Sequence, residues 1–366
     1  MKKNDNCHLS SAVCSLPTVV GIIGGGQLGR MMIPYIKQLG MNVVVLDPDP
    51  NCPCASISEQ IVAPFNCEKG FSELAKKADV ITYEFEHIDV ELLKKLEKQG
   101  ATIYPSVASL EIIQDKYTQK QALAKYGPLV DEFALSMKPP YMLKSRKGGY
   151  DGKGNFVVKT EADVVASVKA LGDDAYMEKL VDFDKEVSVI ATRGQDGSVV
   201  VYPVSENVHK DSILDVTTVP AKISNDISKK SMSVAQNVLD CFKGVGTFCV
   251  ELFVTKDGRV LVNEVAPRVH NSGRYTIEAC RTSQFENHIR AICGLPLGNA
   301  DMVVPAALMK NIVGEHFTNL HDVMSHDGVN VHLYGKTEVK PGRKMGHITV
   351  TGTEEHVEKV RSRCKW

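Results

Sequence analysis

Residues 247–265 read TFCVELFVTKDGRVLVNEV, and this stretch says most about how the chain folds. Two runs rich in β-branched and aromatic residues flank Asp257-Gly258, a pair typical of the turn in a β-hairpin. If these two residues form a two-residue turn, Glu251 and Glu264 lie directly opposite each other on one face. The pattern therefore predicts an antiparallel hairpin that carries two facing carboxylates.

Facing carboxylates destabilise a β-ladder unless something relieves their repulsion. Neither glutamate has a basic neighbour on its own strand. A divalent cation would relieve the repulsion, and a ligand set of oxygens favours Mg²⁺ shared with nucleotide phosphates, with Mn²⁺ as a possible substitute. An exposed face, or one carboxyl group with a raised pKa, would also make the pair tolerable, and both alternatives stay open. Carboxyl groups that point apart, or that pair with basic side chains instead, would contradict the metal site.

Residues 144–154, KSRKGGYDGKG, place four glycines and four cations between two strand-like runs. Glycines expose backbone N–H groups and let a loop move, while Lys and Arg neutralise phosphate charge. The Gly-Lys-Ser/Thr sequence of a P-loop is missing, so the stretch predicts a mobile lid over ATP phosphates. A solvated basic hairpin is the alternative. Asp151 is a carboxylate among cations, which suits contact with a reacting group.

The first hundred residues alternate between strand-like and helix-like segments, and this alternation predicts βαβ units with a parallel sheet. The expected strands are 19–23, 41–46, 79–85 and 101–104, and the expected helices are 27–39, 70–77 and 90–99. Gly24-x-Gly26-x-x-Gly29 follows the first strand, and Asp47 ends the second, as in dinucleotide-binding folds. A nicotinamide dinucleotide, another phosphate ligand and a merely structural turn all stay open for this loop.

From residue 141 the pattern changes to short strands around one helix at 161–171, which predicts a small α+β unit. A long helix at 227–242 and another at 283–293 flank the hairpin. Two clusters of polar side chains follow it. APRVHNSG at 266–273 groups donors for a polar or phosphorylated ligand, and Lys336 lies near Arg343-Lys344 in a turn-rich segment.

Composition limits the classes of protein to which the chain can belong. Its 366 residues suggest two or three domains, and 43% hydrophobic with 24% charged residues is ordinary for a globular protein. The net charge of −1 argues against nucleic acid or an anionic membrane as a partner. No apolar run reaches the roughly 20 residues that span a bilayer, and the ten cysteines are scattered. We therefore expect a soluble, cytoplasmic protein with reduced thiols, in which Cys52 and Cys54 serve packing rather than a metal.

In this order, the motifs resemble the ATP-grasp superfamily and, within it, the 5-(carboxyamino)imidazole ribonucleotide synthetase family. The matching segments are GIIGGGQLGRM from Gly21, ITYEFEHID from Ile81, QDKYTQK from Gln114, LKSRKGGYDGKGNF from Leu143, NVHKDSI from Asn207, VNEVAPRVHNSG from Val262 and YGKTEVKPGRKMGHI from Tyr334. They span almost the whole chain. The resemblance implies an ATP-grasp fold of mixed α/β and α+β class. Its expected parts are a flexible leader (1–17), a Rossmann-like parallel-sheet domain (18–126), a lid domain (127–205), a catalytic domain with a central antiparallel sheet (206–297) and a small C-terminal subdomain (298–366).

The resemblance also implies a reaction. 5-Aminoimidazole ribonucleotide, bicarbonate and MgATP would give the N-carboxylated nucleotide, ADP and phosphate through carboxyphosphate, in purine biosynthesis. A closing lid would protect the carboxyphosphate, or the CO₂ released from it, from water. A homodimer is implied, and the mutase that uses the product is expected to be a separate chain.

Site residues follow from the resemblance, motif by motif. It implies that ATP is bound by Lys116, Lys144, Gly149, Tyr150, Asp151, Gly152, Lys153, Gly154, Glu178, Lys179, Leu180, Val181, Glu186, His209, Asn263 and Glu264. The implied binding residues for the aminoimidazole nucleotide are Gly26, Gln27, Leu28, Glu84, Glu86, His270, Asn271, Ser272, Lys336, Arg343 and Lys344. The implied metal ligands are Glu251 and Glu264, and the implied catalytic residues are Asp151, Tyr150, Arg268 and Lys336. Asp151 is the candidate acceptor of the amine proton.

The chain departs from the family pattern in its leader and in the segment 127–141, which is shorter than usual, so we expect an abbreviated connection into the lid domain. Further functions also stay open. They are a different ATP-grasp enzyme, such as a formate-dependent purine transformylase or a biotin carboxylase, an NAD-dependent oxidoreductase that uses Gly24-x-Gly26-x-x-Gly29, and a non-catalytic nucleotide sensor.

Overall fold

The computed structural model describes residues 16–126, 130–149, 154–172, 174–314, 320–336, 338–340 and 342–363. Of the predicted leader, only residues 16 and 17 are described. Four residues of the predicted lid, Tyr150, Asp151, Gly152 and Lys153, lie outside the described residues.

The N-terminal residues form the predicted parallel sheet, in the order β3-β2-β1-β4. Its strands are β1 (Val19–Ile23), β2 (Asn42–Asp47), β3 (Glu59–Val62) and β4 (Val80–Tyr83), and its helices are α2 (Gln27–Gln38), α3 (Glu68–Lys77) and α4 (Val90–Lys98). The near-continuous apolar sequences of β1 and β2 fit burial on both faces. The strand expected at 101–104 is reduced to one parallel bridge between Ile81 and Ile103, and β3 was not predicted.

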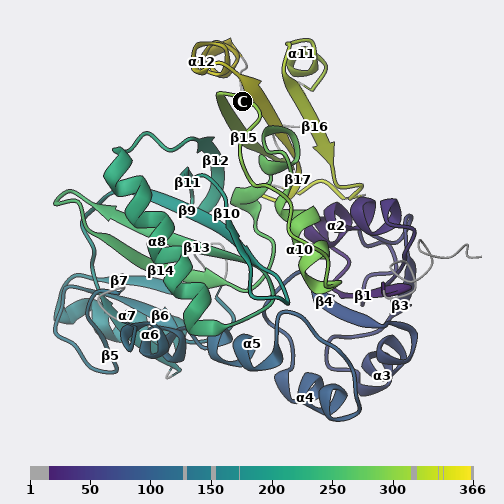
Figure 1. Ribbon diagram of the computed structural model, residues 1–366. Coiled ribbons are helices and arrows are strands. Elements are labelled where there is room, and N and C mark those ends of the chain that lie inside the picture. The colour runs from purple at the N-terminus through teal and green to yellow at the C-terminus, as the bar shows by residue number, and fades with distance from the viewer. Residues whose placement is uncertain are drawn as a thin grey trace, which may run out of the picture.

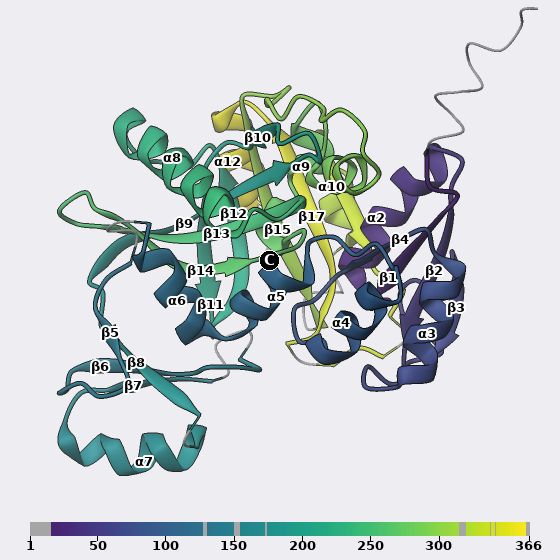
Figure 2. The ribbon, with the colours of Figure 1, turned by 60° about the horizontal axis from the view of Figure 1, so that its bottom comes forward.

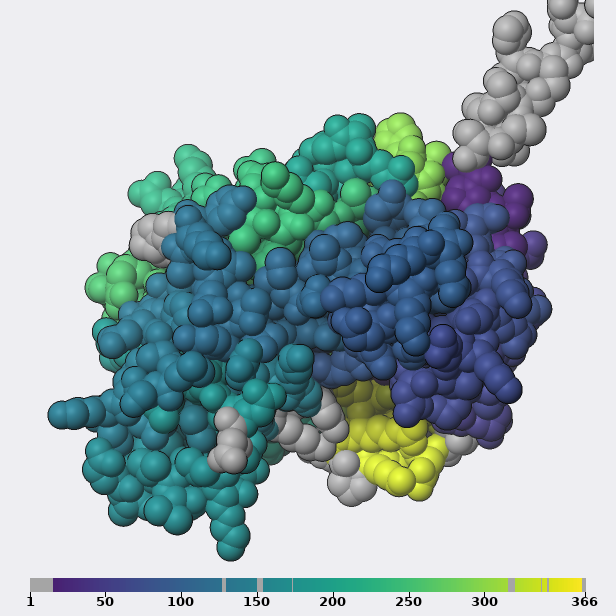
Figure 3. All heavy atoms as spheres, turned by 90° about the horizontal axis from the view of Figure 1, so that it is seen from below, coloured from purple at the N-terminus to yellow at the C-terminus, as the bar shows by residue number. Residues whose placement is uncertain are grey.

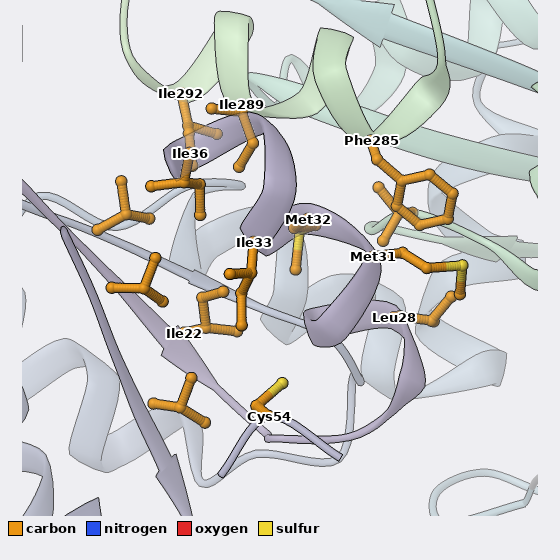
Figure 4. Packing of buried hydrophobic residues seen from close by; sticks show 14 of the residues in the cluster. Ile22, Leu28, Met31, Met32, Ile33, Ile36, Cys54, Phe285, Ile289 and Ile292 are labelled. Atoms are coloured by element: carbon orange, nitrogen blue, oxygen red, sulfur yellow. The ribbon is translucent and has the colours of Figure 1, made fainter. Parts of the chain in front are cut away.

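Helix α2 packs between the parallel sheet and α10 (Gln284–Ile292) of the catalytic domain. Figure 4 shows Ile33 and Ile36 of α2 between Ile22 of β1 and the α10 side chains Ile289 and Ile292. These side chains are almost completely buried, so one apolar core joins the two domains. The position of the N-terminal loop relative to the rest of the molecule is therefore fixed by packing.

Helices α5 (Val107–Gln114) and α6 (Lys116–Ala124) lead to a small antiparallel sheet, in the order β5-β8-β6-β7. Its strands are β5 (Phe133–Ala134), β6 (Tyr141–Ser145), β7 (Asn155–Val158) and β8 (Ala175–Lys179), and α7 (Glu161–Leu171) packs on β6 and β7. This unit projects from the molecule at the lower left of Figure 2. The sheet ends at β8, whereas the lid domain was expected to continue to residue 205.

A large antiparallel sheet holds the remaining strands, in the order β14-β13-β9-β11-β12-β15-β17-β16, with β10 paired to β9. The strands are β9 (Phe183–Arg193), β10 (Val199–Val201), β11 (Ser205–Lys210), β12 (Ile213–Val219), β13 (Gly246–Thr255), β14 (Val260–Ala266), β15 (Ala306–Val313), β16 (Val329–Leu333) and β17 (Lys344–Gly352). The strands of the predicted small C-terminal subdomain continue the central sheet through the β12–β15 pairing.

Helix α8 (Asn225–Phe242) covers the β9, β13 and β14 end of the large sheet through Val234, Val238 and Leu239. The other elements are η1 (Asn271–Gly273), α9 (Thr276–Ala279), α11 (Leu320–Met324) and α12 (Glu354–Arg363). Figure 1 shows the N-terminal domain beside the large sheet, with α11 and α12 at the far end of the C-terminal strands. In the view from below in Figure 3, C-terminal residues (yellow) appear at the bottom of the picture, next to the N-terminal domain (blue and purple) and to the right of the projecting lobe of the small sheet (teal). Within the described ranges, no helix has the length and apolar character to cross a membrane.

Candidate active site

The hairpin of β13 and β14 places Glu251 opposite Glu264, as predicted. The turn itself differs from the prediction, because Thr255 pairs with Arg259 and three residues, 256–258, close the loop. The strands next to the turn are therefore offset by one residue from the predicted register. A β-bulge at Asn263 restores it, since Leu252 faces Val262 while Glu251 faces Glu264.

Adjacent residues of a regular strand point to opposite faces of the sheet. At the bulge, however, Asn263 and Glu264 both line one large cavity together with Glu251. The volume of this cavity is about 630 Å³. Predicted site residues on its wall are Glu86, Lys116, Gly149, Glu186, His209, Glu251, Asn263, Glu264, Arg268, His270, Asn271 and Lys344. Residues from the N-terminal domain, α6 and the large sheet thus meet around a single space.

The two facing glutamates have different electrostatic surroundings. Lys116 Nζ lies 3.0 Å from Glu264 Oε2. The pairing with a basic side chain that was expected to contradict a metal site is therefore present for Glu264, and its partner comes from α6 and not from either strand. Burial alone would lower the pKa of Lys116, but the Glu264 carboxylate outweighs it and the net pKa is raised. Burial, and next the charge of Glu264, raise the pKa of Glu251 to about 7. The carboxyl group of Glu251 is therefore the one whose negative charge is not compensated.

These residues fit a hard divalent cation. Glu251, Glu264 and Asn263 all line one cavity, and carboxylate and amide oxygens suit Mg²⁺. The amide oxygen of Asn263 accepts a hydrogen bond from Lys144 Nζ (3.0 Å). A second donor set, Cys249 with Glu251 and His270, has its ligand atoms within 4.8 Å of one another. Burial raises the pKa of the Cys249 thiol well above its usual range, which disfavours the thiolate that a metal requires. The oxygen set is therefore the better cation site.

Glu86 and Arg268 join the N-terminal domain to the end of the hairpin. Arg268 Nε lies 2.5 Å from Glu86 Oε2, and Nη2 lies 3.1 Å from Oε1, which makes a bidentate ion pair. Burial opposes the charge of Glu86, but Arg268 lowers the pKa of Glu86 to about 2. Both side chains therefore stay ionised on the cavity wall.

His270 lies on the same wall, 3.4 Å from Glu251 through Nε2. Burial, and next the charge of Arg268, lower the pKa of His270 well below its usual range, so its imidazole is neutral near pH 7. Its Nδ1 lies 2.9 Å from the hydroxyl of Ser272. Ser272 is completely buried and does not line the cavity, so it orients His270 rather than facing a ligand.

The glycine loop before α2 is closed by acidic side chains. Glu84 accepts hydrogen bonds from the N–H groups of Gly26 (2.5 Å) and Gly29 (2.8 Å), and Asp47 accepts one from Gly25 (2.7 Å). The N–H groups that would hold the pyrophosphate of a dinucleotide are thus engaged by carboxylates of the chain itself. This arrangement speaks against the nicotinamide alternative. Gly26, Gln27, Leu28 and Glu84 lie outside the wall of the large cavity.

The C-terminal cations occupy different surroundings. Lys344 is buried and lines the large cavity. Lys336 Nζ donates to the backbone oxygen of Lys344 (2.8 Å) and lies over the Tyr334 ring. Arg343 donates instead to the backbone oxygen of Glu338 (2.8 Å), and neither Arg343 nor Lys336 is on the cavity wall.

A small pocket lies beside the large cavity, between the small sheet and the hairpin. It is lined by Lys120, Asp131, Glu132, Glu178, Lys179, Val181, Phe253, Leu261 and Val262. The set includes Glu178, Lys179 and Val181 from the predicted adenine segment, while Leu180 is absent from it. Lys144 Nζ lies 2.8 Å from Glu178 and 3.0 Å from Asn263 Oδ1, so it links the small pocket to the large cavity. Gly154 lies near this strand, where its backbone oxygen accepts from Ser145 N (2.7 Å).

His209 and Glu186 stand together on the large-cavity wall, with Nδ1 of His209 2.5 Å from Glu186 Oε2. Burial opposes the charged imidazole, but Glu186 outweighs it and raises the pKa of His209.

Three family models match the chain. They are an ATP-grasp domain at residues 111–285, a ribonucleotide synthetase preATP-grasp domain at 18–114 and a phosphoribosylaminoimidazole carboxylase C-terminal domain at 307–363. The N5-carboxyaminoimidazole ribonucleotide synthase of Bacillus subtilis is 41% identical over 346 residues, which cover 90% of each chain. The chain belongs to the N5-carboxyaminoimidazole ribonucleotide synthase family of ATP-grasp proteins.

Further relatives agree with this assignment. The chain is 44% identical to the chloroplastic phosphoribosylaminoimidazole carboxylase of Vigna aconitifolia, over 92% of its own length but only 64% of that protein. Among solved structures, the N5-carboxyaminoimidazole synthase of Aspergillus clavatus in complex with ADP and 5-aminoimidazole ribonucleotide matches with a TM-score of 0.86 and 36% identity, covering 94% of this chain and 98% of that one. The predicted family and the ATP-grasp fold are thus confirmed.

Several wall residues were not predicted from the sequence, among them Asn155, Lys185, Glu206, Asn207, Ser212 and Leu214. Lys120 in the small pocket was also missed. It follows Lys116 by four residues on α6, so the helical spacing places both lysines on one face, and this spacing was the available signal.

Proposed function

We propose that this ATP-grasp protein carboxylates the amine of 5-aminoimidazole ribonucleotide with bicarbonate and ATP in purine biosynthesis. The products are 5-(carboxyamino)imidazole ribonucleotide, ADP and phosphate. The observation that carries the proposal is the large cavity, where the Glu251/Glu264 pair and the Glu86–Arg268 pair face one space. The Aspergillus relative, whose structure holds ADP and 5-aminoimidazole ribonucleotide, supports this choice of ligands.

ATP is proposed to lie with its phosphates in the large cavity and its base at the small pocket. The volume of the small pocket is about 10 Å³, so the pocket has to widen to admit a purine ring. Phe253, Leu261 and Val181 give the pocket apolar surface for a purine ring. Glu186 stands on the wall of the large cavity and suits the ribose hydroxyl groups. Lys116 and Lys144 lie toward the hairpin, where their ammonium groups can contact phosphate oxygens.

Glu251 and Glu264 are proposed to hold Mg²⁺ beside these phosphates, with Asn263 next to them. When bound, the ion would neutralise charge on the phosphate oxygens during transfer. Uptake of a cation also favours the ionised form of Glu251, whose pKa is raised to about 7 in its absence. Lys116 then neutralises part of the charge of Glu264 and stays within reach of phosphate.

Bicarbonate is proposed to attack the γ-phosphorus, so that a P–O bond forms and the bond to ADP breaks. The amine nitrogen then attacks the carboxyl carbon, the C–O bond to phosphate breaks, and the amine proton leaves. Arg268, fixed by Glu86, and neutral His270 lie on the wall where the carboxyl group would pass. Asp151 and Tyr150, outside the described residues, stay the predicted lid residues for this step, with Asp151 as the proton acceptor.

The phosphate of the aminoimidazole nucleotide is proposed to bind near Lys344, with Lys336 behind it. We also propose a cytoplasmic homodimer. The cysteines within the described ranges are all free thiols, as expected in a reducing compartment. That a separate mutase consumes the product stays a prediction from the resemblance.

An omission experiment tests the function. ADP release is measured with ATP, bicarbonate and 5-aminoimidazole ribonucleotide, and then with each one left out. The proposal predicts that release falls to background without bicarbonate and is strongly stimulated by the aminoimidazole nucleotide. ADP release that ignores both, or binding of NADPH in place of ATP, would contradict it.

A further inference from the structure

Lys120 is a buried lysine for which the proposed reaction has no role. It lies one turn after Lys116 on α6, and only 5% of its surface is exposed. Its Nζ donates to the backbone oxygen of Val262 (2.8 Å) and lies 3.2 Å from Glu178 Oε1. Lysine is rarely buried without a partner, so its contact with Glu178 calls for a physical reason.

Glu178 is shared between two lysines. Its Oε1 faces Lys120 and accepts from the Tyr176 hydroxyl (2.5 Å), while its Oε2 lies 2.8 Å from Lys144 Nζ. The side chains of Lys120, Glu178 and Lys144 are 6%, 11% and 9% exposed. One buried carboxylate therefore has two cationic partners, which is one more than charge balance requires.

The two lysines differ in what else they contact. Lys120 is tied to a backbone oxygen of β14 and borders the small pocket, away from the large cavity. Lys144 also contacts Asn263, which lies on the large-cavity wall where the phosphates are proposed to bind. Lys144 can therefore turn toward a phosphate, whereas Lys120 is held at Glu178.

We propose that Lys120 is a positioning residue that keeps Glu178 neutralised while Lys144 gives its charge to the nucleotide phosphates. This inference rests on the ATP site of the proposed function. Without Lys120, movement of Lys144 toward phosphate would leave a buried carboxylate without a cation, which is strongly unfavourable. Lys144 would then stay at Glu178, and phosphate binding would weaken while the base still binds.

The charge states of the two residues agree with this role. Burial raises the pKa of Glu178, but Lys120 and next Lys144 outweigh it and bring the pKa to about 2. Burial lowers the pKa of Lys120 to about 8, against the opposing charge of Glu178. Glu178 is thus anionic and Lys120 is mainly cationic at pH 7.

Calorimetric titration with MgATP and with adenosine tests the inference, because adenosine lacks the phosphates that Lys144 would contact. In Lys120→Met, the affinity for MgATP should fall about tenfold, while the affinity for adenosine changes less than about twofold. In Lys120→Met/Glu178→Gln no buried charge retains Lys144, so the MgATP affinity should return to within about threefold of Glu178→Gln alone. Lys125→Met, at an exposed lysine after the same helix, is the matched control and should change neither affinity.

Equal losses for MgATP and adenosine in Lys120→Met would indicate a merely structural role and overturn the inference, as would an unchanged MgATP affinity. A loss that persists undiminished in the double variant would also overturn it. If Lys120→Met does not fold, Glu178→Gln is tested on its own. Because Glu178 borders the pocket proposed for the base, the readout is the ratio of the MgATP affinity to the adenosine affinity, in which a change in base binding cancels. Release of Lys144 predicts that this ratio is kept or increased, and a lower ratio would overturn the inference. A parent protein that binds neither MgATP nor adenosine would contradict the proposed function itself. If the parent binds both and Lys120→Met leaves the ratio of the two affinities unchanged, only the role of Lys120 is contradicted.

Discussion

Glu84 holds the glycine loop through Gly26, whose N–H group points at a glutamate carboxylate 58 residues later in the chain. The same carboxylate accepts from Gly29, so it caps the start of α2 from the end of a neighbouring strand. Anions are favoured at helix N-termini, and here the anion belongs to the protein. A loop that resembles a dinucleotide site thus serves to fix α2 on the sheet.

Replacement of Glu84 by Gln should therefore lower the stability of the N-terminal domain. The amide carries no charge and can accept with one oxygen only, so we expect a loss of about 1–3 kcal/mol in the free energy of unfolding. Urea unfolding of the parent and the variant measures it, with Glu73→Gln, an exposed glutamate of α3, as the control. An effect no larger than that of the control would show that the cap contributes nothing.

Replacement of Glu251 or Glu264 by Gln should weaken the response of turnover to Mg²⁺. Loss of one carboxylate from the proposed cation site should reduce turnover about 100-fold or more and raise the Mg²⁺ concentration needed for half-maximal activity. Steady-state assays across a Mg²⁺ titration measure both effects. Glu355→Gln, at an exposed position of α12, is the matched control. Normal Mg²⁺ dependence in Glu251→Gln would remove this residue from the cation site.

The acid sensitivity of the fold should depend on the Glu86–Arg268 pair. The pKa of Glu86 is about 2 in the folded chain and 4.5 for an ordinary glutamate, so its stabilisation is present above pH 4.5 and is lost as the pH falls toward 2. At pH 7, Glu86→Gln should cost about 3–5 kcal/mol because Arg268 stays buried and unpaired. The difference from the parent in urea unfolding should shrink between pH 4.5 and 3. A difference that stays constant over this range would show that the ion pair is not its source.

Affinity for the aminoimidazole nucleotide should fall at alkaline pH. Burial, and next the charge of Arg343, lower the pKa of Lys336 to about 8, so its positive charge is present below pH 8 and is lost above it. If Lys336 supports phosphate binding, the dissociation constant should rise about tenfold or more between pH 7 and 9.5. Lys336→Met should bind weakly at every pH in this range, with a flat profile. A parent profile that is flat as well would exclude this role.

Asp151→Asn should reduce carboxylation about 100-fold or more, since the amide cannot accept the amine proton. The affinity for MgATP should change less than about twofold. Asp151 belongs to the segment implied to bind ATP, but phosphate contacts are expected from the cations and backbone N–H groups of this segment rather than from a carboxylate. Turnover and MgATP titration, measured on the same preparation, separate the two effects. Full activity in the variant would remove Asp151 from the mechanism.

Much of the fold was predictable because it depends on local patterns. The helix at 161–171 was predicted with its observed bounds, and β1 and β2 were recognised by continuous apolar runs. The pairing of Glu251 with Glu264 was also predicted correctly, although the turn is one residue longer than expected. The bulge at Asn263 compensates for the longer turn, and no local signal marks it.

Contacts between residues far apart in the chain could not be predicted in the same way. The bond from Gly26 to Glu84 and the contact of Lys120 with Glu178 join separate elements, and their geometry depends on how the domains pack. The lid domain implied by the resemblance was expected to end at residue 205, whereas β9 joins the large sheet by pairing with β13 and β11. Strand partners of this kind are set by tertiary contacts, which a single sequence does not reveal.

The central claim is that bicarbonate is activated by ATP in the large cavity, and transfer of oxygen from bicarbonate to phosphate tests it most directly. The protein is mixed with ATP, 5-aminoimidazole ribonucleotide and freshly dissolved ¹⁸O-bicarbonate, and the phosphate is analysed by mass spectrometry before the label exchanges with water. Because the oxygen that attacks phosphorus stays with phosphate, the account predicts one ¹⁸O atom in each phosphate released. Unlabelled phosphate that accumulates together with ADP would contradict the account.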